Sequence, residues 1–193
     1  MRNLLVWMYI MTAIVAVPTQ AGDKARPDIR MYVLDCGTIA VSDMDAFSSS
    51  GDYAKQQATL SGSCFLIRHP KGDLLWDTGL PAGVAHAEPT VNGIFTLTMT
   101  KTLIEQLNEI GIKQQDIEYT SISHSHFDHV GQLSSFEAAT WLVHERELEA
   151  MYATEESSKE FAALKDFDRS VFNGDYDVFG DGSVVILDMP GHT

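Results

Sequence analysis

Four side chains that commonly bind metal ions lie within six residues near the middle of the chain. They are His124, His126, Asp128 and His129, in the sequence HSHFDH. Neutral imidazoles and a carboxylate are the ligands that a zinc-like cation takes in proteins. A cluster this dense indicates a metal site rather than a histidine-rich surface loop or histidines that only make hydrogen bonds.

The local backbone pattern predicts two metal positions at this cluster. A β-prone run at residues 119–122 ends just before His124. Because side chains alternate along an extended chain, we expect His124 and His126 to lie on the same side. Asp128 and His129 come from the next bend and can face a second position. Two metal ions about 3.5 to 4 Å apart are a common hydrolytic device, so the cluster predicts hydrolysis.

The motif HSHFDHVG resembles the H-x-H-x-D-H signature of the metallo-β-lactamase superfamily. Two further segments stand in the order that the superfamily shows, LLWDTG at residues 74–79 and PGHT at residues 190–193. Within the superfamily, MYVLDCGTI, FLIRHPKGDLLWDTGL and GDYDVFGDGSVVI resemble the N-acyl-homoserine lactonase branch. The resemblance extends from about residue 30 to the end of the chain.

The resemblance implies two zinc ions in the intact enzyme and a set of ligands for each. The ligands that it implies are His124, His126 and His192 for the first ion, and Asp128 and His129 for the second. The resemblance also implies that Asp77, at the end of a strand, accepts the second N–H of a metal-bound imidazole from outside the ligand set. The alternative for Asp77 is a carboxylate that caps a turn.

The activity that the resemblance implies is the opening of the lactone ring of N-acyl-homoserine lactones by a hydroxide that bridges the two metal ions, which is quorum quenching. Asp128 would be the general acid for the leaving ring oxygen. The loop from Thr38 to Ser61 is a candidate wall of the acyl-chain pocket. Two other functions stay open: another exported di-zinc hydrolase, such as a β-lactamase or a thioester hydrolase, and an inert metal-binding fragment.

The order of strand, helix and strand before the cluster predicts an α/β fold with layers of helix and sheet. The resemblance implies the αββα sandwich of the superfamily. It also implies a bridging carboxylate and a final histidine after His192, and the sequence contains neither. We therefore expect a C-terminally incomplete domain, truncated after roughly the first half to two-thirds of the sandwich. Such a chain would hold at most one zinc ion well and would be inactive or weakly active.

Apolar patterns, caps and turn residues predict the remaining elements. We expect strands at residues 31–36, 64–68, 74–76, 94–98, 140–143 and 183–187, and helices at 102–110, 130–138, 144–152 and 155–164. Residues 38–62 are expected to form a long surface loop. His86 and His144 lack partner spacing and are not expected to bind metal. The acidic run Asp175, Asp177 and Asp181 fails the calcium-loop spacing, so a hairpin turn is expected there.

The charge balance excludes one class of partner. The chain has 13 Lys and Arg residues against 27 Asp and Glu residues, a formal net charge of −14. A nucleic-acid surface needs clustered basic residues, so neither nucleic acids nor the nuclease branches of the superfamily fit. A small lactone substrate is not repelled by such a surface.

The N-terminus has the pattern of a secretory signal. Arg2 precedes an apolar run at residues 4–17, and small residues follow near Ala21. We expect a signal peptide at residues 1–21, a polar linker at 22–30 and the metallo-β-lactamase-like domain at 31–193. The protein would be periplasmic or secreted, with no stable membrane anchor after cleavage. The alternative is an uncleaved anchor, although the run is shorter than the ~20 residues that span a membrane. The oligomeric state is not predicted.

Two cysteines, Cys36 and Cys64, remain after cleavage. Export would permit a disulfide between them. Both also lie in apolar strand sequences, where a free cysteine often packs as a small buried hydrophobic residue. The sequence leaves both alternatives open.

Overall fold

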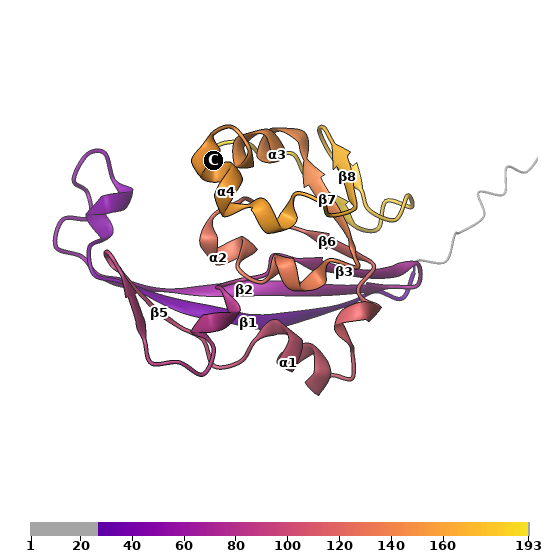
Figure 1. The fold of residues 1–193 in the computed structure, drawn as a ribbon, viewed down its shortest axis with the longest axis horizontal. Coiled ribbons are helices and arrows are strands. Elements are labelled where there is room, and N and C mark those ends of the chain that lie inside the picture. The colour runs from indigo at the N-terminus through magenta and orange to yellow at the C-terminus, as the bar shows by residue number, and fades with distance from the viewer. Residues whose placement is uncertain (1–26, 193) are drawn as a thin grey trace, which may run out of the picture.

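The computed structural model describes residues 27–192. The predicted signal peptide at residues 1–21 lies outside the described residues, as does most of the predicted linker at 22–30 (Figure 1). The first strand begins at Arg30, one residue before the predicted start of the domain.

Ten strands form the framework of the described residues, and eight of them make one mixed sheet (Figure 1). The strands are β1 (Arg30–Val41), β2 (Ala58–His69), β3 (Gly72–Trp76), β4 (Thr90–Asn92), β5 (Phe95–Thr98), β6 (Tyr119–Ser121), β7 (Thr140–His144), β8 (Arg169–Phe172), β9 (Tyr176–Asp177) and β10 (Val185–Ile186). The large sheet has the order β4-β5-β1-β2-β3-β6-β7-β8. Strands β3, β6, β7 and β8 run parallel to one another, whereas the other pairs are antiparallel. The α/β class is therefore confirmed.

Strands β1 and β2 are longer than the sequence patterns indicated. The predicted surface loop at residues 38–62 is wrong at both ends, because β1 continues to Val41 and β2 begins at Ala58. Ile39 and Val41 are buried, and β5 pairs with this part of β1. A third strand thus stabilises residues that look polar and irregular in the sequence. Only the tip of the hairpin, with η1 (Met44–Phe47), projects beyond the sheet (Figure 1).

The helices are short and begin at recognisable caps. They are α1 (Leu103–Glu109), α2 (Phe127–Val130), α3 (Glu145–Met151) and α4 (Glu155–Glu160), with 3₁₀ turns η2 (Ala82–Val84), η3 (Gln114–Asp116), η4 (Leu133–Phe136) and η5 (Ala162–Leu164). The capping box predicted for Thr102 and Glu105 is present at α1. His144 caps α3, as predicted for a helix-start residue. The helix predicted at 130–138 is only a 3₁₀ turn, and the one at 155–164 ends early and continues as η5.

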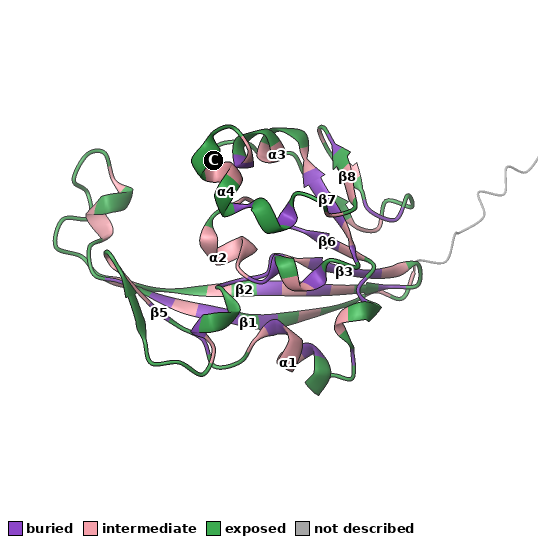
Figure 2. Cartoon of the chain, viewed as in Figure 1, coloured by how far each residue is buried: buried purple, intermediate pink, exposed green. Residues whose placement is uncertain are grey.

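One face of the large sheet is covered by helices. Leu66 pairs with Leu75, Leu75 with Thr120, and Thr120 with Trp141. Side chains of directly paired residues lie on the same face of a sheet, so Leu66, Leu75 and Trp141 share this face. All three are fully buried. Helix α1 packs over the β1 to β3 end through Leu103 and Leu107, while α3, α4 and η5 cover the β7 end. The middle three residues of β3 and of β7 are all buried, whereas burial alternates along much of β1 and β2 (Figure 2).

The opposite face of the large sheet is covered in part by a second, smaller layer. Strands β9 and β10 form the hairpin predicted around residues 180–182 and pack on Leu74 and Leu142. Beside them lies a pocket of about 750 Å³, lined by apolar residues such as Ile67, Trp76 and Val143. His124 and His192 are among the residues that line it. The described residues therefore form a helical layer, a sheet and the beginning of a second sheet.

Cys36 and Cys64 form a disulfide between β1 and β2. Their Cα atoms are 5.8 Å apart, and both side chains are buried. Cys36 lies where the ladder register shifts between Asp35 and Thr38, at a β-bulge. The disulfide thus fixes the irregular part of the hairpin, and a closed loop of this size contributes about 3.5 kcal/mol on the chain-entropy model.

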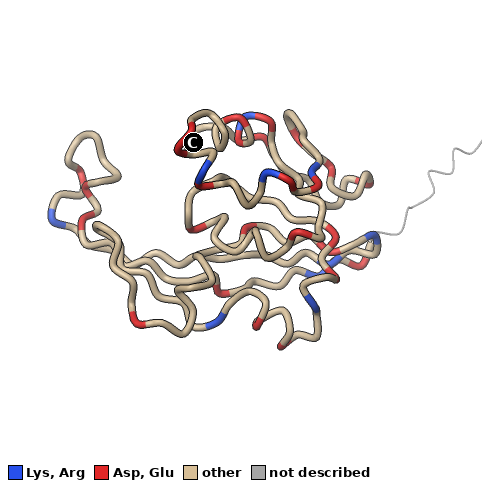
Figure 3. Tube along the Cα trace, viewed as in Figure 1, with Lys and Arg blue, Asp and Glu red and all other residues tan. Residues whose placement is uncertain are grey.

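The surface of the described chain carries more acidic than basic positions, and they are spread over most elements (Figure 3). Among the described residues, no helix has both the length and the apolar character needed to cross a membrane.

Candidate metal centre

The metal loop, which we define as residues 123–129, follows the end of β6. This strand lies between β3 and β7, and all three are parallel. Because parallel strands end at the same edge of a sheet, Asp77 after β3 meets the loop after β6. The backbone N–H of Asp77 donates to the carbonyl of Ser121 at 2.9 Å. Short strands thus deliver functional side chains from distant parts of the sequence to one edge.

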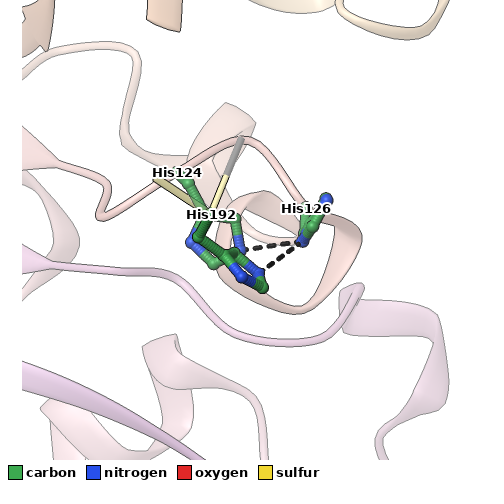
Figure 4. A group of neighbouring side chains, drawn as sticks. All are labelled: His124, His126 and His192. Atoms are coloured by element: carbon green, nitrogen blue, oxygen red, sulfur yellow. Dashed lines mark hydrogen bonds between the residues drawn. The ribbon is translucent and has the colours of Figure 1, made fainter. Parts of the chain in front are cut away.

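Three imidazoles converge at this edge (Figure 4). We call His124, His126 and His192 the histidine triad. His126 Nδ1 lies 2.9 Å from His124 Nε2 and 3.2 Å from His192 Nε2. One nitrogen from each of the three residues lies within 4.8 Å of the other two. His192 reaches the site from the segment after β10, 66 residues beyond His126 in the sequence.

The electrostatic surroundings keep His124 of the triad neutral at pH 7. Burial, together with the nearby His129, His126 and His192, lowers the pKa of His124 to about 4. A neutral imidazole has a free lone pair, whereas an imidazolium has none. The triad therefore presents nitrogen donors to a cation without first having to lose a proton from His124.

Asp128 and His129 form a separate pair beside the triad. Asp128 Oδ2 lies 3.4 Å from His129 Nε2, and the rings of His124 and His129 are 4.1 Å apart between centroids. Burial would lower the pKa of His129, but hydrogen bonds to Asp128 and Asp77 outweigh it and raise the pKa to about 9. Burial opposes ionisation of Asp128, yet the hydrogen bond to His129 holds its pKa below the usual value. The pair is therefore an ion pair at neutral pH.

Asp77 makes hydrogen bonds to two residues of the metal loop, Ser123 and His129. Its side chain is nearly buried, and its Oδ2 lies 2.9 Å from His129 Nδ1. Its Oδ1 accepts the backbone N–H of Ser123 at 2.6 Å. The residue has φ of 61°, a left-handed conformation that Asp tolerates better than most residues. This turn directs the carboxylate back under the metal loop.

Close backbone packing holds the loop against the turn after β3. The N–H of Gly131 donates to the carbonyl of Gly79 at 2.8 Å, and Thr78 donates from both N and Oγ1 to the carbonyl of His129. A Cβ on Gly131 would lie 2.3 Å from the backbone N of Pro81. Buried Gln132 donates to the carbonyls of Thr78 and Leu80. Only glycine permits this close approach of the two backbones. Because these hydrogen bonds join the loop to the turn after β3, the loop cannot move away from Asp77 without breaking several of them.

The donor set fits a divalent cation of the zinc type. Three imidazole nitrogens are a common set for a catalytic zinc site that keeps one position open. Asp128 and His129 add an oxygen and a nitrogen donor next to the triad. Among the described residues, the triad is the one group of three or more such side chains that could hold a metal ion.

Sequence reasoning did not identify two residues that make hydrogen bonds within or to the metal loop. Ser123 Oγ lies within 3.1 Å of His124 Nδ1 and within 3.0 Å of both His129 Nδ1 and Asp77 Oδ2. Glu147 on α3 accepts the backbone N–H of Ser125 at 2.7 Å. The position of Ser123 next to His124 could have drawn attention to it, whereas no spacing in the sequence connects Glu147 with the loop.

The side chains that were not expected to bind metal lie outside the histidine triad and make other contacts. His86 is exposed and pairs with Glu105 at 2.9 Å. His144 accepts the N–H of Arg146 at the start of α3. In the β9–β10 hairpin, Asp177 accepts the N–H groups of Gly180 and Gly182, as a turn carboxylate does.

Comparisons with known proteins point to one family. The family model of the metallo-beta-lactamase superfamily matches residues 58–193. The N-acyl homoserine lactonase AttM of Azorhizobium caulinodans is 30% identical over 181 residues, which cover 86% of this chain and 68% of the relative. An N-acyl homoserine lactonase of Bacillus cereus is 31% identical over 137 residues, which cover 67% of this chain and 54% of the relative.

Solved structures give the same result. An N-acyl homoserine lactone hydrolase with the product N-hexanoyl-L-homoserine bound at its catalytic metal centre superposes with a TM-score of 0.70 at 28% identity, over 84% of this chain and 66% of the other. A B. thuringiensis AiiA variant with N-decanoyl-L-homoserine at its active site has a TM-score of 0.71 at 28% identity, with the same coverage. The chain thus spans about half to two-thirds of the length of the proteins that it resembles.

Proposed function

The chain belongs to the metallo-beta-lactamase superfamily, and from this premise we propose that it carries the metal-binding part of a hydrolase that opens the lactone ring of N-acyl homoserine lactones. The observation that carries the proposal is the convergence of the histidine triad beside the Asp128–His129 pair. The names of the relatives support the substrate class, because they are lactonases of N-acyl homoserine lactones.

We propose zinc as the ion of the histidine triad. His124, His126 and His192 would hold it, and an ion there would act as a Lewis acid and lower the pKa of a water molecule. Asp128 and His129 would contribute to a second zinc ion in the intact enzyme. Two ligands are fewer than the four that zinc takes, so the described residues would hold at most one ion well.

Asp128 would transfer a proton from the attacking water to the leaving ring oxygen during ring opening. Hydrolysis adds one water molecule across the ester bond: the oxygen of water joins the carbonyl carbon, and the ring oxygen leaves with a proton. Since the pKa of Asp128 lies below its usual value, its carboxylate is ionised at neutral pH. It can therefore accept a proton at Oδ2 from the attacking water and then pass it to the leaving ring oxygen. Asp77 would keep the neighbouring His129 oriented throughout.

An aromatic track leads from the metal loop toward the tip of the β1–β2 hairpin. The ring of Phe127, within the loop, lies 5.8 Å from that of Phe95, and the ring of Phe95 lies 6.3 Å from that of Phe47. Phe47 is exposed at the tip. We propose that this track forms a wall of the acyl-chain pocket. Because β1 ends at Val41 and β2 begins at Ala58, only residues 42–57 of the candidate loop at 38–61 remain as the part of this wall that the hairpin tip supplies.

We also propose export to the periplasm or the medium. The charged start, the apolar run and the small residues near Ala21 support it. The buried Cys36–Cys64 disulfide adds an independent argument, because disulfides persist in oxidising compartments. N-terminal sequencing of the protein recovered from the periplasm or medium should begin near Gly22, whereas a start at Met1 would contradict cleavage.

The test of the proposed function compares substrates on one protein. Zinc-loaded chain is given an N-acyl homoserine lactone, a β-lactam and a thioester, and hydrolysis is followed by proton release, with the A. caulinodans relative as positive control. Slow lactone opening that Asp128→Asn abolishes supports the proposal. Faster turnover of the β-lactam or the thioester would replace it with the other di-zinc hydrolase. Zinc binding without any turnover would identify an inert metal-binding fragment.

A further inference from the structure

Ser123 occupies a position between the two parts of the candidate metal centre. Its Oγ lies 3.0 Å from Asp77 Oδ2, 3.1 Å from His124 Nδ1 and 3.0 Å from His129 Nδ1. His124 belongs to the triad and His129 to the neighbouring pair. One hydroxyl group therefore contacts an imidazole of each part and the buried carboxylate beneath them.

The hydroxyl has one proton to donate, and its best acceptor is Asp77. A charge-assisted hydrogen bond to a carboxylate is stronger than one to a neutral imidazole. Asp77 Oδ1 already accepts the backbone N–H of Ser123 at 2.6 Å, which holds the residue in place over the carboxylate. With its proton directed to Asp77 Oδ2, the hydroxyl can only accept hydrogen bonds from the two imidazoles.

This direction of donation decides which nitrogen of each imidazole must keep its proton. His124 Nδ1 must carry the proton in order to donate to Ser123 Oγ. His129 Nδ1 faces two acceptors, Asp77 Oδ2 and Ser123 Oγ, so it must carry a proton as well. In both rings Nε2 is then the atom left for a metal ion, which at His129 must first displace the second proton of the imidazolium. The Nε2 of His124 faces His126 in the triad, and that of His129 faces Asp128.

We propose that Ser123 is a positioning residue through which the single carboxylate of Asp77 fixes the Nδ1–H tautomer of His124 as well as that of His129. The inference rests on the proposed metal centre but not on a lactone as substrate. Without the hydroxyl, His124 loses its acceptor at Nδ1, and the tautomer with its proton on Nε2 becomes populated. That proton would point at His126 Nδ1, where the triad needs a lone pair.

Three variants separate this role from a general effect on the loop. Ser123→Ala removes the hydroxyl and Ser123→Thr keeps it. Ser125→Ala is the matched control, because it removes a neighbouring hydroxyl that makes no hydrogen bond to the described residues. Long-range ¹H–¹⁵N NMR spectra at pH 7.5 read the tautomer of His124 in zinc-free protein and those of both rings with zinc bound. Zinc affinity is measured by competition with a chelating dye, and circular dichroism checks the fold.

We expect Nδ1–H tautomers in the wild type, Ser123→Thr and Ser125→Ala, and a mixture for His124 in Ser123→Ala. Loss of an outer hydrogen-bond partner of a metal ligand typically lowers metal affinity about 10- to 100-fold, so Ser123→Ala should lose that much, while the two controls stay near wild type. A wild-type His124 with its proton on Nε2 would overturn the proposal without any variant. An unchanged tautomer in folded Ser123→Ala would overturn it too. Lactone turnover enters neither reading, so failure of the proposed substrate would not be mistaken for failure of this inference.

Discussion

The histidine triad and the Asp128–His129 pair lie side by side, but His124 of the triad and His129 of the pair differ in charge. His124 has a pKa lowered to about 4, so it is neutral at pH 7. His129 has a pKa raised to about 9 and is an imidazolium at the same pH. A cation can enter the triad without displacing a proton from His124, whereas at the pair it must displace one from His129. We therefore expect the triad to fill first.

The two parts also differ in how the fold holds them. The pair belongs to the metal loop, which hydrogen bonds to Asp77, Thr78 and the carbonyl of Gly79 hold against the turn after β3. The triad is complete only when His192 arrives from the segment after β10. The turn after β3 thus holds the charged pair, while the triad also needs the separate segment that carries His192. This difference can be tested by breaking each part separately.

The largest effect is expected from His126→Ala. His126 Nδ1 lies between the other two imidazoles of the triad, so its loss removes a donor and also the contact that joins His124 to His192. Zinc affinity should fall by more than the ~100-fold that loss of an outer-shell partner can cost. His86→Ala is the matched control, because it removes a surface histidine outside the cluster. Equal affinities of the two variants would contradict the assignment of the triad.

A smaller effect, on stability, is expected from Gly131→Ala. The added Cβ would lie 2.3 Å from the N of Pro81 and 2.4 Å from the C of Leu80, and backbone cannot yield as a flexible side chain can. Overpacking of this kind typically costs about 1 to 3 kcal/mol in the free energy of unfolding. Gly83→Ala is the control, since nothing lies within 4 Å of its Cβ position. Urea denaturation of both variants measures the difference, and equal midpoints would show that the loop is not anchored here.

The smallest effect is expected from Glu147→Gln. The amide oxygen still accepts the N–H of Ser125, but a charge-assisted hydrogen bond becomes a neutral one. The loss is about 1 kcal/mol, which corresponds to roughly fivefold in zinc affinity at the triad. Glu149→Gln, on the exposed side of α3, should leave affinity unchanged. A loss in Glu147→Gln as large as that of His126→Ala would mean that α3 contributes far more to the site than one hydrogen bond.

The sequence was most informative where local chemistry decides the structure. The spacing of His124, His126, Asp128 and His129 identified the loop, and the capping box of Thr102 and Glu105 located α1. The ends of β1 and β2 were missed because β5 stabilises them from a distance. The disulfide stayed undecided, since only the register of β1 against β2 brings Cys36 to Cys64.

The contacts that shift the pKa values of the metal centre could not be predicted from the sequence either, because they join residues that are distant in the sequence. The raised pKa of His129 depends on hydrogen bonds to Asp128 and to Asp77, which the chain reaches 46 residues before Ser123, whereas burial and the neighbouring imidazoles lower the pKa of His124. A motif specifies the residue types of a site. Which imidazole is charged follows only from the way in which parallel strands bring their ends together.

The most direct test of this account is a pH titration of the metal-free protein followed by the imidazole ¹⁵N signals of His124 and His129. The pKa of His129 is raised, so its charged form should persist above pH 6.5 and disappear only as pH rises through about 9. The pKa of His124 is lowered, so its ring should stay neutral until pH falls toward about 4. Between pH 6 and 8 we expect His129 to be an imidazolium beside a neutral His124. Titration of both rings together near pH 6.5, or a charged His124 beside a neutral His129, would contradict it.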